Sequence, residues 1–126
     1  MCRVGLLAIV VALVAAGCGG ASDYSLGKTR SCLVKKDVRI GGKLDFVAST
    51  ATGGAFVAHL RRNFVTIVFG EKNGDAEQIE LAYQRFAFPN VRPGLADVLK
   101  RERNAVMLWH EHPQDRDLTL VRSCRR

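Results

Sequence analysis

AFVAHLRRNFVTIVFG, residues 55–70, is the stretch that decides the fold. Two runs rich in β-branched and aromatic residues, 55–60 and 64–70, flank the short polar connection Arg61-Arg62-Asn63, and this pattern predicts a β-hairpin. In the second run, both sets of alternating positions carry apolar side chains, as in a strand covered on both faces. We therefore expect residues 64–70 to form a central strand.

The rest of the chain divides into helices and strands by its apolar spacing and turn residues. The expected elements are a helix over 24–36, a strand over 44–49, a helix over 76–88, a short helical turn within 95–103, a strand over 105–110 and a last helix that Pro113 opens. The order α-β-β-β-α-β-α predicts an α+β fold, a small antiparallel or mixed sheet of three to four strands covered by helices. In the helix over 76–88 the residues expected to face the core are Ala76, Ile79, Ala82, Tyr83 and Phe86.

The first residues have the three parts of an export signal. Arg3 supplies a positive charge, an uncharged apolar run covers 4–16, and small residues follow it. The run is shorter than the roughly 20 apolar residues that a membrane-spanning helix needs. At its end, Ala15-Ala16-Gly17-Cys18 resembles the lipobox of bacterial lipoproteins.

The resemblance to bacterial lipoproteins implies a lipid on Cys18. Residues 1–17 would then be the signal peptide, 18–23 a short flexible tether that begins with lipidated Cys18, and 24–126 a single α+β domain. The lipid would anchor the protein to the outer side of the bacterial cell membrane. The same residues leave a second hypothesis open, ordinary secretion with cleavage after Ala21 and loss of the cysteine.

The four cysteines can be divided on this basis. Cys2 leaves with the signal and Cys18 carries the lipid, so Cys32 and Cys124 remain as a pair in an oxidising compartment. An even pair in an exported chain favours a disulfide, which would join the first and last helices. Two separate buried thiols are the alternative, because unpaired cysteine also buries readily.

The composition is basic, with a formal net charge of +7. For an exported protein we expect the anionic partner to be lipid head groups or an envelope polymer, and not nucleic acid. An unidentified envelope protein is a further possible partner. The residues expected to contact an anionic surface, if the fold brings them to one face, are Lys35, Lys36, Arg39, Arg61, Arg62, Lys100, Arg101 and Arg103.

The best candidates for metal ligands are His110 and His112, joined by His59 of the hairpin. Histidines at i and i+2 of a strand project from one face and can supply two ligands when a third arrives from elsewhere. The chain has neither a GxxxxGK[ST] phosphate-binding motif nor a GxSxG nucleophile motif. The sequence therefore predicts no cofactor and favours a non-catalytic protein over an enzyme.

Two functional hypotheses follow from these patterns. The first is a membrane-anchored envelope lipoprotein, a non-catalytic binding or interaction domain with a weak preference for anionic surfaces. The second is a small metal-binding protein that uses His59, His110 and His112.

Overall fold

The computed structural model describes residues 23–125. The signal peptide, Cys18 and the tether up to residue 22 lie outside the described residues, so lipid attachment stays a prediction. The helices and strands are α2 (Leu26–Lys35), β1 (Arg39–Ile40), α3 (Phe46–Ser49), β2 (Ala55–His59), β3 (Phe64–Phe69), α4 (Asn73–Phe86), the 3₁₀ helix η1 (Arg92–Gly94), α5 (Leu95–Val98), β4 (Leu99–Glu102), β5 (Ala105–Trp109) and α6 (Asp115–Ser123).

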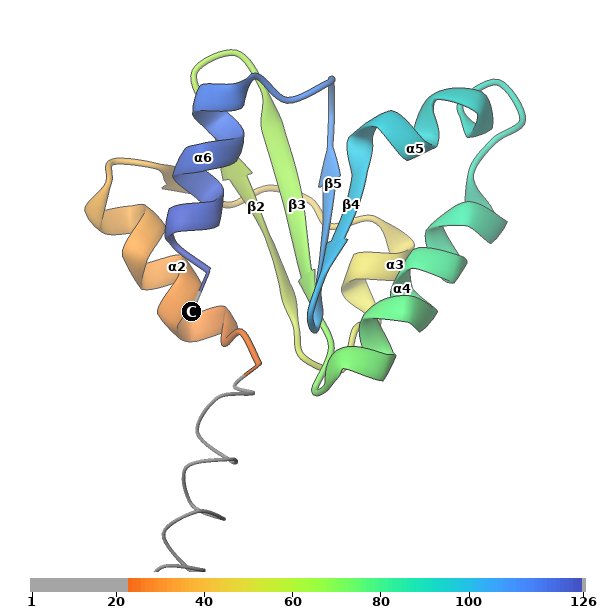
Figure 1. The fold of residues 1–126 in the computed structure, drawn as a ribbon, viewed down its shortest axis with the longest axis horizontal. Coiled ribbons are helices and arrows are strands. Elements are labelled where there is room, and N and C mark those ends of the chain that lie inside the picture. The colour runs from red at the N-terminus through yellow and green to blue at the C-terminus, as the bar shows by residue number, and fades with distance from the viewer. Residues whose placement is uncertain (1–22, 126) are drawn as a thin grey trace, which may run out of the picture.

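Within residues 23–125, five strands form one sheet of order β1-β2-β3-β5-β4, and every neighbouring pair is antiparallel. The hairpin β2–β3 and the central place of β3 are as expected. Figure 1 shows α2 and α6 on one side of the sheet and α3, α4 and α5 on the other. The α+β class is confirmed, with helices on both faces of the sheet.

Each face of the sheet has its own hydrophobic core. Ile67, Met107 and Trp109 face α2 and α6, together with Leu33 and Val121 of these helices. The opposite core contains Val68 and Val106 of the sheet with Val47, Ala76, Ile79, Tyr83, Leu95 and Leu99. Because β3 contributes to both cores, the prediction of a central strand with apolar side chains on both faces is confirmed.

The prediction of a strand over 44–49 is wrong, because this segment contains the short helix α3. The Asp45 carboxylate accepts a hydrogen bond of 2.8 Å from the backbone N–H of Ala48 and so caps the helix. At the other end, the Ser49 and Thr50 hydroxyls donate to the Phe46 carbonyl oxygen. Local side-chain bonds of this kind favour a helical turn over an extended strand, although Phe and Val suit either.

The helical turn expected within 95–103 is only partly right, and the sheet has more strands than expected. A turn does form at α5, but Leu99–Glu102 continue as strand β4, which pairs with β5. Arg103, with φ of 50°, and Asn104 make the tight turn between these strands. With the short edge strand β1, β4 raises the count from the expected three to four strands to five within the described residues.

The helix expected over 76–88 is α4, which begins earlier. The Asp75 carboxylate accepts hydrogen bonds from the backbone N–H groups of Glu71 and Lys72, and the helix therefore starts at Asn73. Of the residues expected to face the core, Ala76, Ile79 and Tyr83 are buried and Ala82 is half-buried. Phe86 is 58 % exposed, so the last turn of the predicted apolar face lies at the surface.

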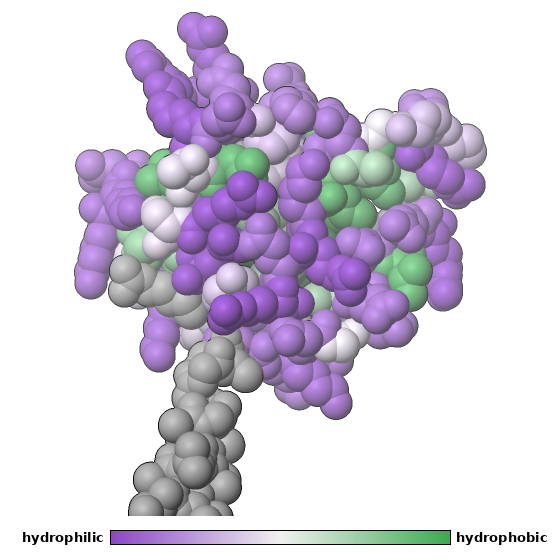
Figure 2. Space-filling model, in the orientation of Figure 1, coloured by the Kyte–Doolittle hydropathy of each residue, from purple (hydrophilic) through white to green (hydrophobic). Residues whose placement is uncertain are grey.

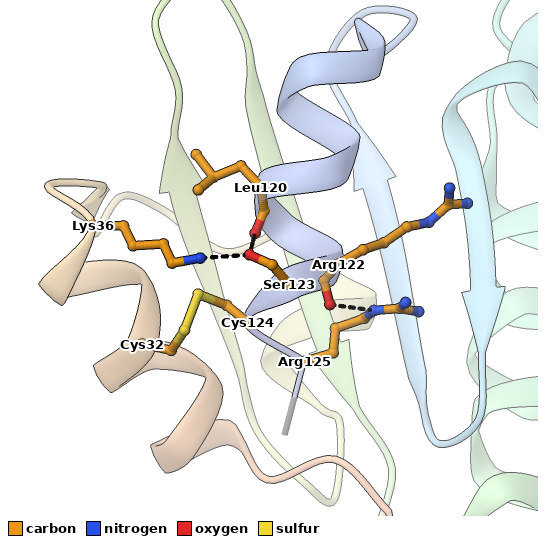
Figure 3. The surroundings of a disulfide bond; sticks show 7 residues. All are labelled: Cys32, Lys36, Leu120, Arg122, Ser123, Cys124 and Arg125. Carbon is orange, nitrogen blue, oxygen red and sulfur yellow. Dashed lines mark hydrogen bonds between the residues drawn. A yellow bond between two sulfur atoms is a disulfide. The ribbon is translucent and has the colours of Figure 1, made fainter.

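The predicted disulfide between Cys32 and Cys124 is confirmed. Their Cα atoms lie 5.3 Å apart, and the bond joins α2 to the end of α6, 92 residues further along the chain. Figure 3 shows these two segments side by side, with the Lys36 ammonium donating to the Ser123 hydroxyl at 2.6 Å. Cys124 is fully buried, so the bond forms part of the core between the two helices and the sheet.

Candidate functional site

The eight basic residues singled out in the sequence fall into two groups. Lys35 and Lys36 end α2, Arg39 lies on the edge strand β1, and Arg61 and Arg62 form the turn after β2. Lys36, Arg39 and Arg61 surround one pocket of about 430 Å³, to which α6 adds Arg116. We call Lys35, Lys36, Arg39, Arg61, Arg62 and Arg116 the basic end.

The remaining three basic residues lie elsewhere. Lys100 and Arg101 belong to β4, at the opposite edge of the sheet from β1, and Arg103 follows in the turn. The Arg101 guanidinium pairs with the Glu80 carboxylate at 3.5 Å, and Arg103 lies over the Tyr24 ring, 5.3 Å from its centroid. The structure therefore does not bring all eight residues to one face.

The cations of the basic end have few acidic partners. Within residues 23–125, no ion pair is made by Lys35, Arg39, Arg61 or Arg62. Arg116 makes one long ion pair, 3.9 Å, with the Asp117 carboxylate. All six side chains are exposed. Figure 2 shows hydrophilic side chains projecting from the end of the molecule where the β2–β3 turn lies. This end therefore has an excess of positive charge, although Asp37 and Asp117 line the same pocket.

The β2–β3 turn of the basic end is distant from the residue where the described chain begins, whereas Lys35 and Lys36 line a pocket together with Asp23. The backbone of Tyr24 exchanges two hydrogen bonds with the Asn104 side chain, 2.7 Å and 2.8 Å long. Asn104 lies in the β4–β5 turn, and the β2–β3 turn with Arg61 and Arg62 is at the other end of the strands (Figure 1). A chain entering at residue 23 therefore approaches the sheet from the end opposite to Arg61 and Arg62.

The three histidines do not form a cluster. Strand β5 ends at Trp109, so His110 and His112 do not project together from a strand as expected. His112 pairs with Asp97 (Nδ1 to Oδ1, 2.7 Å), His59 Nε2 lies 2.6 Å from the Gly41 carbonyl oxygen, and His110 stacks on the Phe64 ring. In the part of the chain that the structure describes, no group of three or more His, Cys, Asp or Glu side chains is placed to hold a metal ion.

A second pocket, of about 550 Å³, was not predicted from the sequence. It lies between the sheet and the helices α3, α4 and α5, and we call it the aromatic pocket. Its lining includes Phe46, Phe64, Thr66, Phe86, Leu95 and Leu108. Such a pocket, apolar with a few polar groups, is the usual form of a small-molecule site.

Tyr83 and Asp45 connect two walls of the aromatic pocket. The Tyr83 hydroxyl donates to the Asp45 carboxylate, with oxygen distances of 2.8 Å and 3.1 Å, and so holds α4 against the N-cap of α3. Burial, this hydrogen bond and the charge of Asp45 all raise the pKa of Tyr83 above its usual range. Tyr83 therefore stays protonated at physiological pH and acts as a hydrogen-bond donor, not as a base.

The raised pKa makes the stability of the domain sensitive to alkaline pH. A raised pKa in the folded state gives a contribution that is complete below the unfolded-state value, about 10 for tyrosine, and is lost as the pH rises above it. Above pH 10 we expect Tyr83 to lower the free energy of unfolding by up to about 1.4 kcal/mol per pH unit.

Urea unfolding between pH 8 and pH 11.5 measures this contribution. Tyr83→Phe should lose the alkaline slope, and the control Tyr24→Phe, which changes the other of the 2 tyrosines, should keep it. Equal slopes in the parent and in Tyr83→Phe would show that Tyr83 is not held protonated.

Comparisons of the chain with protein-family models, with curated proteins and with solved structures found no match. Within residues 23–125 there is also no helix with the length and apolar content needed to cross a membrane. The functional proposal below therefore depends on the residues themselves.

Proposed function

We propose that this protein is a membrane-anchored lipoprotein of the bacterial envelope, whose domain is a non-catalytic module that binds anionic surfaces through its basic end. The lipid on Cys18 holds the mature chain on the outer side of the membrane. The lipobox-like residues 15–18 support the anchor, and the disulfide agrees with an oxidising compartment.

The observation that carries the binding function is the group of unpaired cations at the basic end. Four of its side chains, Lys35, Arg39, Arg61 and Arg62, make no ion pair with any other residue of 23–125. A charge of this kind near an anionic surface contributes about 1 kcal/mol to binding. By contrast, Arg101 and Arg122 at the other edge of the sheet are paired with Glu80 and Glu102.

The position of the tether favours an envelope polymer over the head groups of the anchoring membrane. Four residues, 19–22, lie between Cys18 and Asp23, so the tether spans at most about 18 Å. Arg61 and Arg62 lie at the far end of strands about 20 Å long, and the potential of a membrane falls off within about 10 Å at 0.1 M salt. The anchored domain thus presents these two cations to phosphate or carboxylate groups on the side away from its anchor, whereas Lys35 and Lys36 lie nearer to the tether.

The contacts of the described side chains support the binding of anionic surfaces better than the binding of a metal ion by the histidines. His59, His110 and His112 each contact a different neighbour: the Gly41 carbonyl, the Phe64 ring and the Asp97 carboxylate. Tyr83 keeps its proton. These contacts favour the first of the two functional hypotheses.

The test uses the unlipidated chain, residues 18–126 with Cys18→Ser, exported behind a signal that adds no lipid. We expect it to bind linear polyphosphate and anionic vesicles at 50 mM salt, to release both as salt rises, and to leave neutral vesicles unbound. A metal chelator should change nothing. Binding that persists at 500 mM salt and disappears with chelator would contradict the proposal and favour the histidines.

A further inference from the structure

The aromatic pocket is separate from the basic end and has no part in the proposed function. Strands β3 and β5 form one wall, α4 and α5 form the other, and α3 with the connection before it closes one side. The polar lining groups are Lys43, Asp45, Thr66, Tyr83 and His110, and apolar side chains from both the sheet and the helices lie among them. We call Lys43 and Thr66 the polar side of the pocket, and the phenylalanines Phe46, Phe86 and Phe88 its apolar side.

The apolar side of the pocket is unusually exposed. Phe46 is 68 % exposed, Phe86 is 58 % and Phe88 is 74 %, and the rings of Phe46 and Phe86 make an edge-to-face contact at 5.6 Å. Figure 2 shows the hydrophobic surface beside α5. Scattered exposed apolar residues are normal, but phenylalanines gathered around one open pocket indicate a binding site.

Thr66 is a polar group on the pocket wall without a partner. Its side chain lies on β3, the residue is 7 % exposed, and its hydroxyl makes no hydrogen bond with any other residue of 23–125. The hydroxyl oxygen is not one of the fully buried atoms that lack a partner, so it is accessible from the open pocket. A ligand in the pocket can therefore accept a hydrogen bond from Thr66.

Among the charged side chains that line the pocket, Lys43 is the cation that can pair with a ligand. Both oxygens of Asp45 are already used by the Tyr83 hydroxyl, and one of them also accepts from the Ala48 N–H. Lys43 is exposed and makes no ion pair within the described residues. An anionic group is therefore favoured beside Lys43 and disfavoured beside Asp45, which carries a negative charge.

We propose that the aromatic pocket binds a single-chain amphipathic anion, a molecule with one apolar chain and a carboxylate or phosphate head. The head lies toward Lys43 and accepts a hydrogen bond from the Thr66 hydroxyl. The chain lies along Phe46, Phe86 and Phe88, where its burial removes apolar surface from water.

Two probes with the same chain and opposite heads test the assignment. Decanoate and decyltrimethylammonium are titrated into the unlipidated chain below their micelle concentrations, with heat as the readout. We expect decanoate to bind at least about fivefold more tightly than decyltrimethylammonium, since one partly exposed charge pair changes the affinity by about this factor. Decyl phosphate has a phosphate head in place of the carboxylate and is also an anion, so it should bind like decanoate.

Three variants locate the site. Lys43→Gln should weaken decanoate binding about fivefold and leave the ammonium probe unaffected, because only the charge of the exposed side chain changes. Thr66→Val keeps the shape and removes the hydroxyl, and should also weaken decanoate about fivefold. The control Lys100→Gln removes an equal charge at the far edge of the sheet and should leave both affinities unchanged.

A separate control distinguishes this site from the basic end. The double variant Arg61→Glu, Arg62→Glu should retain decanoate binding although it loses polyphosphate. Equal affinities for the two heads, unchanged decanoate binding in Lys43→Gln, or no binding of any probe would overturn the assignment. None of these results would affect the proposed binding of anionic surfaces.

Discussion

Replacement of Cys32 and Cys124 by serine is expected to lower the free energy of unfolding by about 4 to 5 kcal/mol. The disulfide closes a loop over a sequence separation of 92 residues, and in the chain-entropy model a loop of this length gives a stabilisation of that size. Domains of this kind are stable by only about 5 to 15 kcal/mol, so the double variant should lose a large part of its stability.

The position of the bond adds to the expected effect. Cys124 is fully buried beside the first core, and the polar contact between Lys36 and Ser123 is exposed, so little besides core packing would hold the end of α6 on α2 without the disulfide. Urea unfolding of the unlipidated chain and of its double serine variant measures the difference. Two alkylatable thiols in the oxidised, folded parent would contradict the bond itself.

Cys18→Ser is expected to abolish lipid attachment completely. The lipobox-like residues 15–18 place this cysteine at the end of the signal, and serine has no sulfur to acylate. In a bacterial host supplied with labelled palmitate, the parent should incorporate label and fractionate with membranes, whereas the variant should remain an unlabelled, uncleaved precursor.

Cys2→Ser is the matched control for this experiment. Cys2 lies within residues 1–17, which the lipobox resemblance predicts to leave with the signal, so we expect this variant to incorporate as much palmitate as the parent. Equal labelling of the parent and Cys18→Ser would show that the anchor is not on Cys18. A mature chain that begins after Ala21 would instead support ordinary secretion.

Local patterns in the sequence were sufficient for the elements with strong periodicity. The alternation in 64–70 indicated a strand covered on both faces, and β3 is central and contributes to both cores. The disulfide followed from counting cysteines in an exported chain. Both predictions used information that lies within one segment or within the composition.

The elements that the sequence did not predict depend on contacts between distant segments. The sequence predicted a short helical turn within 95–103, but Asn104 bonds Tyr24 and Gly70 and so fixes the turn that pairs β4 with β5. Strand β1 has only two residues and no periodicity to detect. Segment 44–49 became a helix because Asp45 caps it.

The aromatic pocket could not be found from one segment, because β3, β5, α3, α4 and α5 all contribute to it. One local signal was present. The sequence FAFPNV, residues 86–91, places Phe88 and Val91 around a proline turn, where apolar side chains have no helical face to join. The split of the basic residues likewise required the sheet order, which puts β1 and β4 at opposite edges.

Polyphosphate binding to the lipidated protein, held on anionic vesicles at 50 mM salt, tests the central claim most directly. The parent should bind, and Arg61→Glu with Arg62→Glu should weaken binding about 30-fold or more, since each lost cation contributes about 1 kcal/mol. The matched control, Arg85→Glu with Lys100→Glu, makes the same change in charge on α4 and β4, away from the basic end, and should bind like the parent. Equal binding by the two double variants, or a parent that loses polyphosphate once its lipid is in the vesicle, would contradict an outward-facing basic end that binds anions.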